Sequence, residues 1–180
     1  MARVTVNVFM VRHGRTSFTA RGLLCGWSDP PLDDEGVAQA RILASALGGR
    51  MFDGIWSSDL RRAVETARLA TGIEPVRDGR IRELDLGDLD GMRFDQCLPD
   101  VQAGLIAFDD FAAPGGESVT DLGARVHSFL AELPAGDHLV VTHGGVMRLL
   151  LRGADGDRPV APCELVELQL PQAGGKTRPA

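Results

Sequence analysis

Residues 4–14 read VTVNVFMVRHG, and this stretch decides the fold. Apolar residues alternate over positions 4–8 and then run without interruption over positions 9–11. That pattern predicts a β-strand that becomes buried on both faces towards its end. The apolar run stops at Arg12 and His13, just before a glycine. A strand that ends in two potential cations and a turn residue indicates a place where an anion can bind.

The composition of the whole chain is typical of one globular domain. Of its 180 residues, 44% are hydrophobic, which is enough for a single core. The formal charge of −6 argues against nucleic acid or an anionic membrane as the main partner. No transmembrane or signal-peptide pattern is present, and three scattered cysteines without metal-ligand spacing fit a reduced cytoplasm. We therefore expect a cytoplasmic protein, with a domain over residues 1–171 and a flexible tail over 172–180.

Strand-like and helix-like segments alternate along the chain. Beyond the first strand, we expect amphipathic helices over 33–48, 58–72, 117–133 and 146–151, and short strands over 54–57, 138–141 and 164–170. Asp33 is the expected cap of the first helix, and Ser58 or Asp59 that of the second. Residues 80–92 are ambiguous, part strand and part loop, and 94–114 suit short helices and a loop. The alternation predicts an α/β fold: a single domain with a mainly parallel central sheet and helices on both faces.

Cations, histidines and glycines gather where three predicted strands end. They are Arg12 and His13 after the first strand, Arg61 and Arg62 after residues 54–57, and His143, Gly144 and Gly145 after residues 138–141. Ligands of open α/β sheets bind beyond the carboxyl ends of the strands, so these residues should meet. Guanidinium groups, helix starts and glycine backbones all suit phosphate oxygens. Each residue alone fits a surface cation, a core histidine or a turn glycine, but together they favour a phosphate site.

Several ordered blocks resemble the histidine phosphatase superfamily, also called phosphoglycerate-mutase-like. They are VRHGRT at 11–16, GLLCGWSDPPLDDEGVAQA at 22–40, SSDLRRAVETA at 57–67, RELDLGDLDG at 82–91, PGGES at 114–118 and VVTHGGVMR at 140–148. The resemblance extends roughly from residue 4 to 170 and implies a phosphoglycerate-mutase-like fold. Within the superfamily, the short length and the GWSDPPL segment are most similar to the α-ribazole phosphatase branch.

The resemblance implies hydrolysis of a small phosphorylated substrate through a phosphohistidine, without metal or cofactor. His13 would be the nucleophile and Glu83 the acid, although Asp85, Asp88 and Asp90 lie close by in the sequence. Arg12, Arg62 and His143, the last as a cation or donor, would hold the phosphoryl oxygens. The other substrate-binding positions are Gly14, Thr19, Cys25, Gly26 and Gly144.

Two of these assignments carry further conditions. His13 must be neutral, with an acceptor such as a backbone carbonyl on its other nitrogen. Arg62 is chosen over Arg61 because Arg61 can pair with Glu65 four residues on.

Arg15 stands where the family often has glutamate, and it either alters the charge at the mouth of the pocket or is a surface substitution.

Two alternative functions are phosphoglycerate mutase-type phosphoryl transfer and a non-catalytic phosphate-binding module. A mutase needs extra cations to hold a second acidic group, yet the segment 92–116 has Arg93 as its only cation, and the chain has no tyrosine. Intact candidates for nucleophile and acid count against a mere binding module. The sequence therefore favours hydrolysis, and it leaves a homodimer open.

Overall fold

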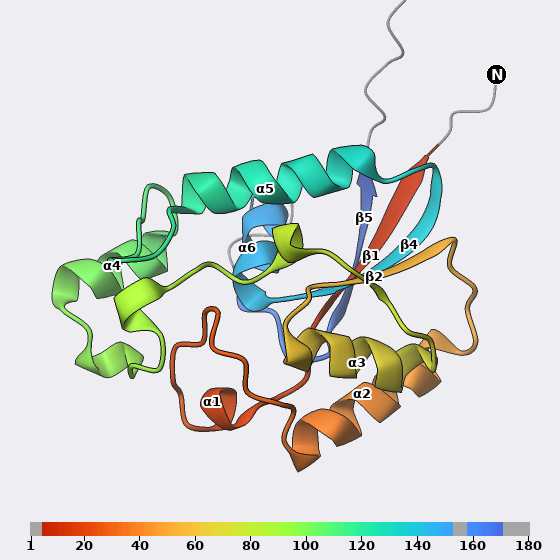
Figure 1. Cartoon of the computed structure of the whole chain (residues 1–180), viewed down its shortest axis with the longest axis horizontal. Coiled ribbons are helices and arrows are strands. Elements are labelled where there is room, and N and C mark those ends of the chain that lie inside the picture. Colours follow the sequence, from red (N-terminus) through yellow and green to blue (C-terminus); the bar gives the residue numbers. More distant parts are fainter. Residues whose placement is uncertain (1–4, 153–157, 171–180) are drawn as a thin grey trace, which may run out of the picture.

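The computed structural model describes residues 5–152 and 158–170, so the predicted tail at 172–180 lies outside the described residues. Five strands form one sheet in the order β3-β2-β4-β1-β5 (Figure 1). They are β1 (Val6–Arg12), β2 (Gly54–Ser57), β3 (Val76–Arg77), β4 (Gly136–Thr142) and β5 (Leu165–Leu170). All pairs are parallel except that of β1 with the edge strand β5. The predicted α/β fold with a mainly parallel sheet is confirmed.

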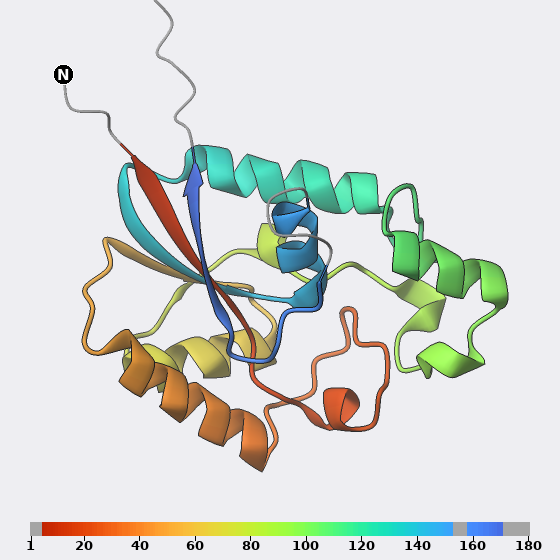
Figure 2. The ribbon, with the colours of Figure 1, turned by 180° about the vertical axis from the view of Figure 1, so that it is seen from behind.

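Helices cover both faces of the sheet. They are α1 (Ser17–Ala20), α2 (Asp34–Leu47), α3 (Arg61–Thr71), α4 (Pro99–Ala107), α5 (Val119–Glu132) and α6 (Gly144–Leu151). Helices α2 and α3 lie on one face, α5 and α6 on the other, and α4 stands beyond the sheet (Figures 1 and 2). Within the described ranges, no helix combines the length and apolar character needed to cross a membrane.

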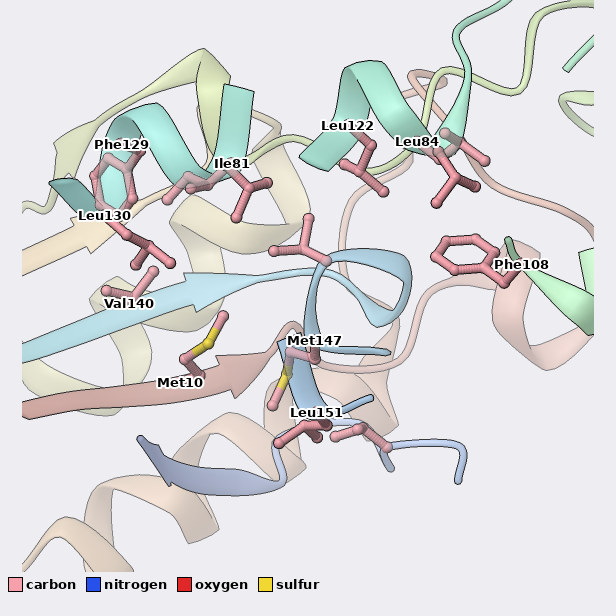
Figure 3. Packing of buried hydrophobic residues seen from close by; sticks show 14 of the residues in the cluster. Met10, Ile81, Leu84, Phe108, Leu122, Phe129, Leu130, Val140, Met147 and Leu151 are labelled. Carbon is pink, nitrogen blue, oxygen red and sulfur yellow. The ribbon is translucent and has the colours of Figure 1, made fainter. Parts of the chain in front are cut away.

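The sheet separates two apolar clusters. On one face, Met10 packs with Phe129 of α5 and other buried residues of α5 and α6 (Figure 3). On the other face, Phe9 and Val11 pack against Leu43 of α2 and the alanines of α3. Successive residues of β1 thus enter opposite clusters, which is why its apolar run is continuous rather than alternating.

The predicted N-terminal cap of α2 is confirmed, whereas that of α3 is not. The Asp33 side chain accepts from the N–H of Gly36, as predicted for the start of α2. The predicted Ser58 or Asp59 cap of α3 is wrong, because Leu60 occupies the cap position without a side-chain bond. Instead, the N–H of Arg61 donates to Asp29 from a distant loop at 2.7 Å.

The ambiguous segment 80–92 forms no strand of the sheet. Its regular parts are two short 3₁₀ turns, Gly79–Ile81 and Gly87–Leu89, and the chain between them is irregular. The strand part of its prediction is therefore wrong. The backbone groups of this segment bond to side chains and loops instead of to a neighbouring strand, as described below.

The loop after β1 packs directly on the start of α2. A Cβ on Gly36 would lie 2.1 Å from the carbonyl oxygen of Arg15, and one on Gly14 would lie 2.7 Å from that of Gly36. Neither backbone position has room for a methyl group. This contact fixes the loop that immediately follows His13.

We predict that Gly36→Ala lowers the free energy of unfolding by about 1–3 kcal/mol, because the added methyl forces the loop off the helix. Gly123→Ala is the matched control within α5, where a Cβ would meet only Leu149 at 3.9 Å. Removing glycine there should be neutral or stabilising by up to about 1 kcal/mol. Urea denaturation of both variants measures this difference, and equal effects would contradict the close packing.

Candidate active site

The parallel register of the central strands brings the sequence-distant candidates to one edge of the sheet. Arg12 lies opposite Thr142 in the β1–β4 pair, and the N–H of His13 donates to the Thr142 carbonyl at 2.9 Å. His13 and His143 therefore follow neighbouring strand ends. Their ring centroids are 5.1 Å apart, with one ring edge-on to the other.

His13 is held as a neutral imidazole with a defined tautomer. Its Nδ1 lies 2.7 Å from the carbonyl oxygen of Gly14, which places the ring hydrogen on Nδ1. The Nε–H of Arg62 points at the other nitrogen, Nε2, at 3.3 Å, so Nε2 carries a lone pair. Burial lowers the pKa of His13 well below 6.5, and the charge of Arg62 lowers it further. The carbonyl acceptor that the sequence analysis requires is present.

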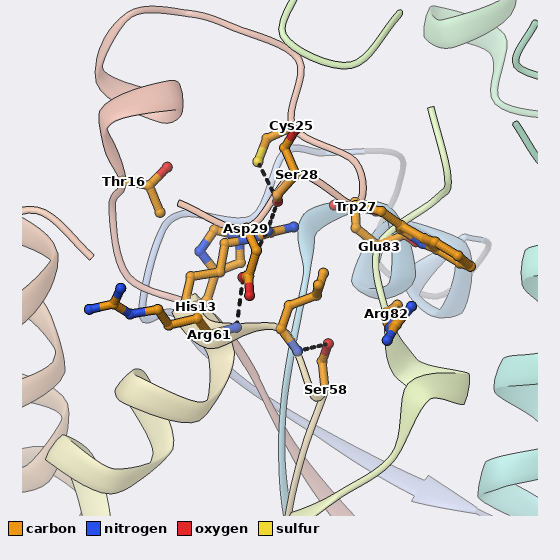
Figure 4. A network of polar contacts seen from close by, with 12 residues as sticks. His13, Thr16, Cys25, Trp27, Ser28, Asp29, Ser58, Arg61, Arg82 and Glu83 are labelled. Atoms are coloured by element: carbon orange, nitrogen blue, oxygen red, sulfur yellow. Dashed lines mark hydrogen bonds and ion pairs between the residues drawn. The ribbon is translucent and has the colours of Figure 1, made fainter. Parts of the chain in front are cut away.

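Arg62, and not Arg61, faces His13. The Arg62 side chain is fully buried, and its two terminal nitrogens donate to the carbonyls of Ser28 at 2.6 Å and Gly26 at 2.8 Å. Arg61 turns to solvent and pairs with Glu65 at 2.7 Å, as predicted. Figure 4 shows the loop that carries Ser28 together with His13 and Arg61. The guanidinium of Arg62 thus joins the loop to the imidazole.

Three buried nitrogen atoms of this cluster have no hydrogen-bond partner among the described residues. They are both ring nitrogens of His143 and the Nε of Arg12. Burial lowers the pKa of His143 well below 6.5, and the neighbouring Arg62 and His13 lower it further. Both effects favour the neutral form of the His143 ring. Buried polar groups without partners are rare, and oxygen atoms of an anion would accept from Arg12 Nε and from the ring N–H of His143.

Glu83 reaches the same cluster from the segment between β3 and α4. Its Oε1 accepts from the backbone N–H of Leu84 at 2.9 Å, and both carboxylate oxygens lie 3.1 Å from the N–H of Gly145. A Cβ on Gly145 would lie 2.2 Å from Oε1, so the contact needs glycine. Because α6 starts directly after His143, the carboxylate lies at the start of that helix.

The other acids of the segment have structural contacts. Asp90 accepts from the backbone N–H groups of Gly26 and Ser28, and Asp85 accepts from that of Gly87. Asp88 lies against the turn at Gly115. Among the acids of this segment, Glu83 is the one that lines the same cavity as His13.

A cavity of about 670 Å³ opens onto the cluster. Its polar lining includes Arg12, His13, Thr19, Cys25 and Glu83, and its apolar lining Leu23, Leu24, Leu84, Leu86, Phe94, Leu105, Ile106 and Phe108. Arg62 and His143 are fully buried and are not among the residues that line the cavity. The site combines a small polar end with a larger apolar chamber.

The predicted substrate-binding residues divide into two groups. Thr19 and Cys25 line the cavity, and burial raises the pKa of the Cys25 thiol to about 11, which keeps it protonated. Gly14 and Gly26 instead allow close packing around the cluster: a Cβ on Gly14 would lie 2.7 Å from the carbonyl oxygen of Gly36, and one on Gly26 would lie 2.8 Å from the backbone nitrogen of Leu86. Gly144 begins α6, and a Cβ there would lie at an ordinary contact distance of 3.4 Å from Arg12 Nε.

Of the two roles considered for Arg15, the structure favours a surface residue over one that changes the charge at the mouth of the pocket. It pairs with Asp33 at 2.8 Å and with Glu35 at 2.6 Å at the start of α2. Its guanidinium is therefore engaged by the acidic side chains at the start of α2.

Sequence reasoning missed the apolar wall of the cavity and one contact to the acid. Leu105, Ile106 and Phe108 come from α4 and its C-terminal cap, where apolar residues follow no clear helical stripe. The indole N–H of Trp27 donates to the Glu83 carbonyl at 2.9 Å. Trp27 lies in the quoted GWSDPPL block, but nothing local in that block indicates this distant partner.

We predict that stability falls as the pH drops below the unfolded-state histidine pKa of about 6.5. Below this pH the histidines of the unfolded chain bind protons, whereas buried His13 and His143 stay neutral. The free energy of unfolding then falls by about 1.4 kcal/mol per pH unit for each histidine until its lowered pKa is reached. In urea denaturation between pH 7.5 and 5.5, His143→Gln should lose less stability than the parent. His127→Gln, at an exposed position, is the control. Equal losses in all three proteins would contradict the neutral burial.

Comparison with known proteins identifies the same superfamily that the sequence motifs resemble. The sequence model of the histidine phosphatase superfamily (branch 1) matches residues 8–171. The probable phosphoglycerate mutase GpmB of Yersinia pestis is 36% identical over 157 residues, which are 81% of this chain and 73% of that protein.

Solved structures agree with the sequence match. A phosphoglycerate mutase from Thermus thermophilus is 40% identical, with a TM-score of 0.84 over 90% of this chain and 92% of that one. A mycobacterial hydrolase is 31% identical, with a TM-score of 0.79 over 92% of each chain. The chain therefore belongs to the histidine phosphatase superfamily.

Proposed function

We propose that the chain is a phosphomonoester hydrolase that works through a phosphohistidine on His13, in the cytoplasm and without metal or cofactor. The observation that carries this proposal is the neutral His13, whose Nε2 lone pair faces Arg62. The unpartnered nitrogens of Arg12 and His143 support it, because they lack the acceptors that a phosphate supplies.

The first half-reaction transfers the phosphoryl group from an alcohol to His13. Nε2 attacks phosphorus, the bond from phosphorus to the ester oxygen breaks, and the carboxyl group of Glu83 protonates the departing oxygen. Arg12, Arg62 and His143 donate to the phosphoryl oxygens as negative charge spreads over them. For this, Arg62 exchanges its bonds to loop carbonyls for bonds to phosphate.

The second half-reaction hydrolyses the phosphohistidine. Glu83, now a carboxylate, accepts a proton from water as the water oxygen attacks phosphorus. The bond from phosphorus to Nε2 breaks, and inorganic phosphate leaves. The same donors hold the phosphoryl oxygens in both steps.

The cavity lining favours a bulky, largely apolar alcohol as the leaving group. A phosphoglycerate carboxylate would need a cation, and beyond Arg12 the cation on the described lining is Arg148. Arg148 already donates to the carbonyls of Leu105 and Ile106 in α4. Hydrolysis of a phosphate ester is also what the resemblance to the α-ribazole phosphatase branch implies.

Phosphoglycerate mutase-type transfer is the second candidate. It is favoured by the names of similar proteins, among them the Yersinia pestis relative and the Thermus thermophilus structure. A mutase would return the phosphoryl group from His13 to a second position of the same substrate instead of to water.

We predict that phenyl phosphate is hydrolysed in the presence of chelator and that His13→Ala lowers kcat by about 10³-fold or more, since the covalent route is lost. Quenching in alkaline detergent should trap a base-stable, acid-labile phosphoryl group on the parent only. Turnover that needs added metal, or that survives in His13→Ala, would contradict the proposal. Phosphate binding without turnover would indicate a binding module, and isomerisation of phosphoglycerate would indicate the mutase.

We predict that kcat/KM rises along the series ethyl, butyl and hexyl phosphate by about fourfold per methylene, because each buried CH₂ contributes about 0.8 kcal/mol. Leaving-group basicity is nearly constant in this series, so the slope reports apolar contact. Ile106→Asn, in the cavity wall, should flatten the slope. Ile42→Asn, at an exposed position of α2, is the matched control. A flat series, or faster turnover of glycerol phosphate, would exclude the apolar chamber as the alcohol site.

A further inference from the structure

Glu83 stands on backbone that belongs to neither a helix nor a strand. Strand β3 ends at Arg77, and residues 82–86 follow the first 3₁₀ turn as irregular chain. Buried carbonyl groups of such a segment need donors from elsewhere. What supplies those donors also determines where the Glu83 carboxyl group points.

Arg125 of α5 supplies them. Its Nη1 donates to the carbonyls of Arg80 at 2.8 Å and Arg82 at 2.7 Å, and its Nη2 donates to the carbonyl of Glu83 at 2.7 Å. One guanidinium thus bonds three carbonyls within four consecutive residues. The last of these carbonyls belongs to the proposed acid itself.

Glu117 completes the arrangement. Its carboxylate accepts from Nε of Arg125 at 3.0 Å and from Nη2, so all five N–H donors of the guanidinium are used. The same carboxylate accepts from the N–H of Asp85 at 3.0 Å, and the Glu117 N–H donates to the Asp85 carbonyl at 3.0 Å. The chain is therefore held on both sides of Glu83.

The pair is well placed to act on the acid without touching a ligand. The Arg125 and Glu117 side chains are only 17% and 16% exposed. Neither is among the residues that line the cavity. On the other side of the segment, the Glu83 carboxylate is bonded to the first turn of α6 through Gly145. Its backbone is tied to α5 and its side chain to α6.

We propose that Arg125 and Glu117 are positioning residues that aim the Glu83 carboxyl group at the departing alcohol oxygen; this rests on the acid role of Glu83 in the proposed function. Displacement of a reacting group by about 1 Å can cost about 10²-fold in rate. Lysine cannot replace the arginine, because it has three donors and no planar fork.

The test compares two substrates on the same preparation of each variant. Hexyl phosphate needs a proton on its leaving oxygen, whereas the p-nitrophenolate of p-nitrophenyl phosphate leaves without one. Their ratio of kcat/KM does not depend on the fraction of folded enzyme. Arg125→Lys, and Arg125→Met combined with Glu117→Gln, should lower the value for hexyl phosphate about 10²-fold and that for p-nitrophenyl phosphate less than about threefold.

Arg80→Met is the matched control. Arg80 joins the same segment to the same helix through its 2.8 Å ion pair with Glu132. Removing that surface contact should leave the substrate ratio unchanged. A ratio that changes as much in Arg80→Met as in Arg125→Lys would overturn the proposal, because any loosening of the segment would then suffice.

Glu83→Gln separates this inference from the proposed function. It should change the ratio as the Arg125 variants do, and adding Arg125→Lys to it should cost hexyl phosphate nothing further. If Glu83→Gln changes the ratio and the Arg125 variants do not, the positioning role is overturned and the acid role stands. If Glu83→Gln leaves the ratio unchanged, the acid role fails, and the positioning role fails with it.

Discussion

The parallel pairing of β1 with β4 is the constraint on which the site depends. Because Arg12 lies opposite Thr142, the next residue of each strand is a histidine, and the two rings meet. A slip of two residues would keep the side-chain faces but separate the rings by a further ~6.6 Å. The apolar clusters on both faces of β1 prevent that slip, since the buried residues of the strand are matched to one cluster or the other. Core packing thus sets the distance between His13 and His143.

The second constraint is electrostatic. The arginines that would bind phosphate are also the charges that, after burial itself, keep the nucleophile unprotonated, as the lowered pKa of His13 indicates. Arg62 can be fully buried because the carbonyls of Gly26 and Ser28 accept from it. A dianion would replace those carbonyls and relieve the repulsion between buried cations. In the proposed reaction, one guanidinium would therefore serve both nucleophile activation and binding of the anion.

How much of this could be predicted from sequence depends on how local each interaction is. The buried strand β1, the Asp33 cap and the Arg61–Glu65 pair involve neighbours in the chain, and all are predicted correctly. The cap of α3 is not, because Asp29 arrives from a loop. Likewise, the segment 80–92 resembles a strand in part, but its carbonyls bond to a side chain more than forty residues away. The wall of the cavity is equally hidden, because α4 shows no apolar stripe.

The two halves of the proposed chemistry are consequently built in different ways. His13 is held by main-chain bonds within the sheet, to Thr142 and through its own ring to Gly14. Glu83 lies outside any regular element: its carbonyl accepts from the side chains of Arg125 and Trp27, and Glu117 holds the nearby Asp85 N–H. Strand ladders in a buried sheet open only with the whole fold, whereas side-chain bonds to an irregular segment can be changed one residue at a time. The phosphate end can therefore stay constant while the position of the acid and the apolar wall beside it adapt to different alcohols.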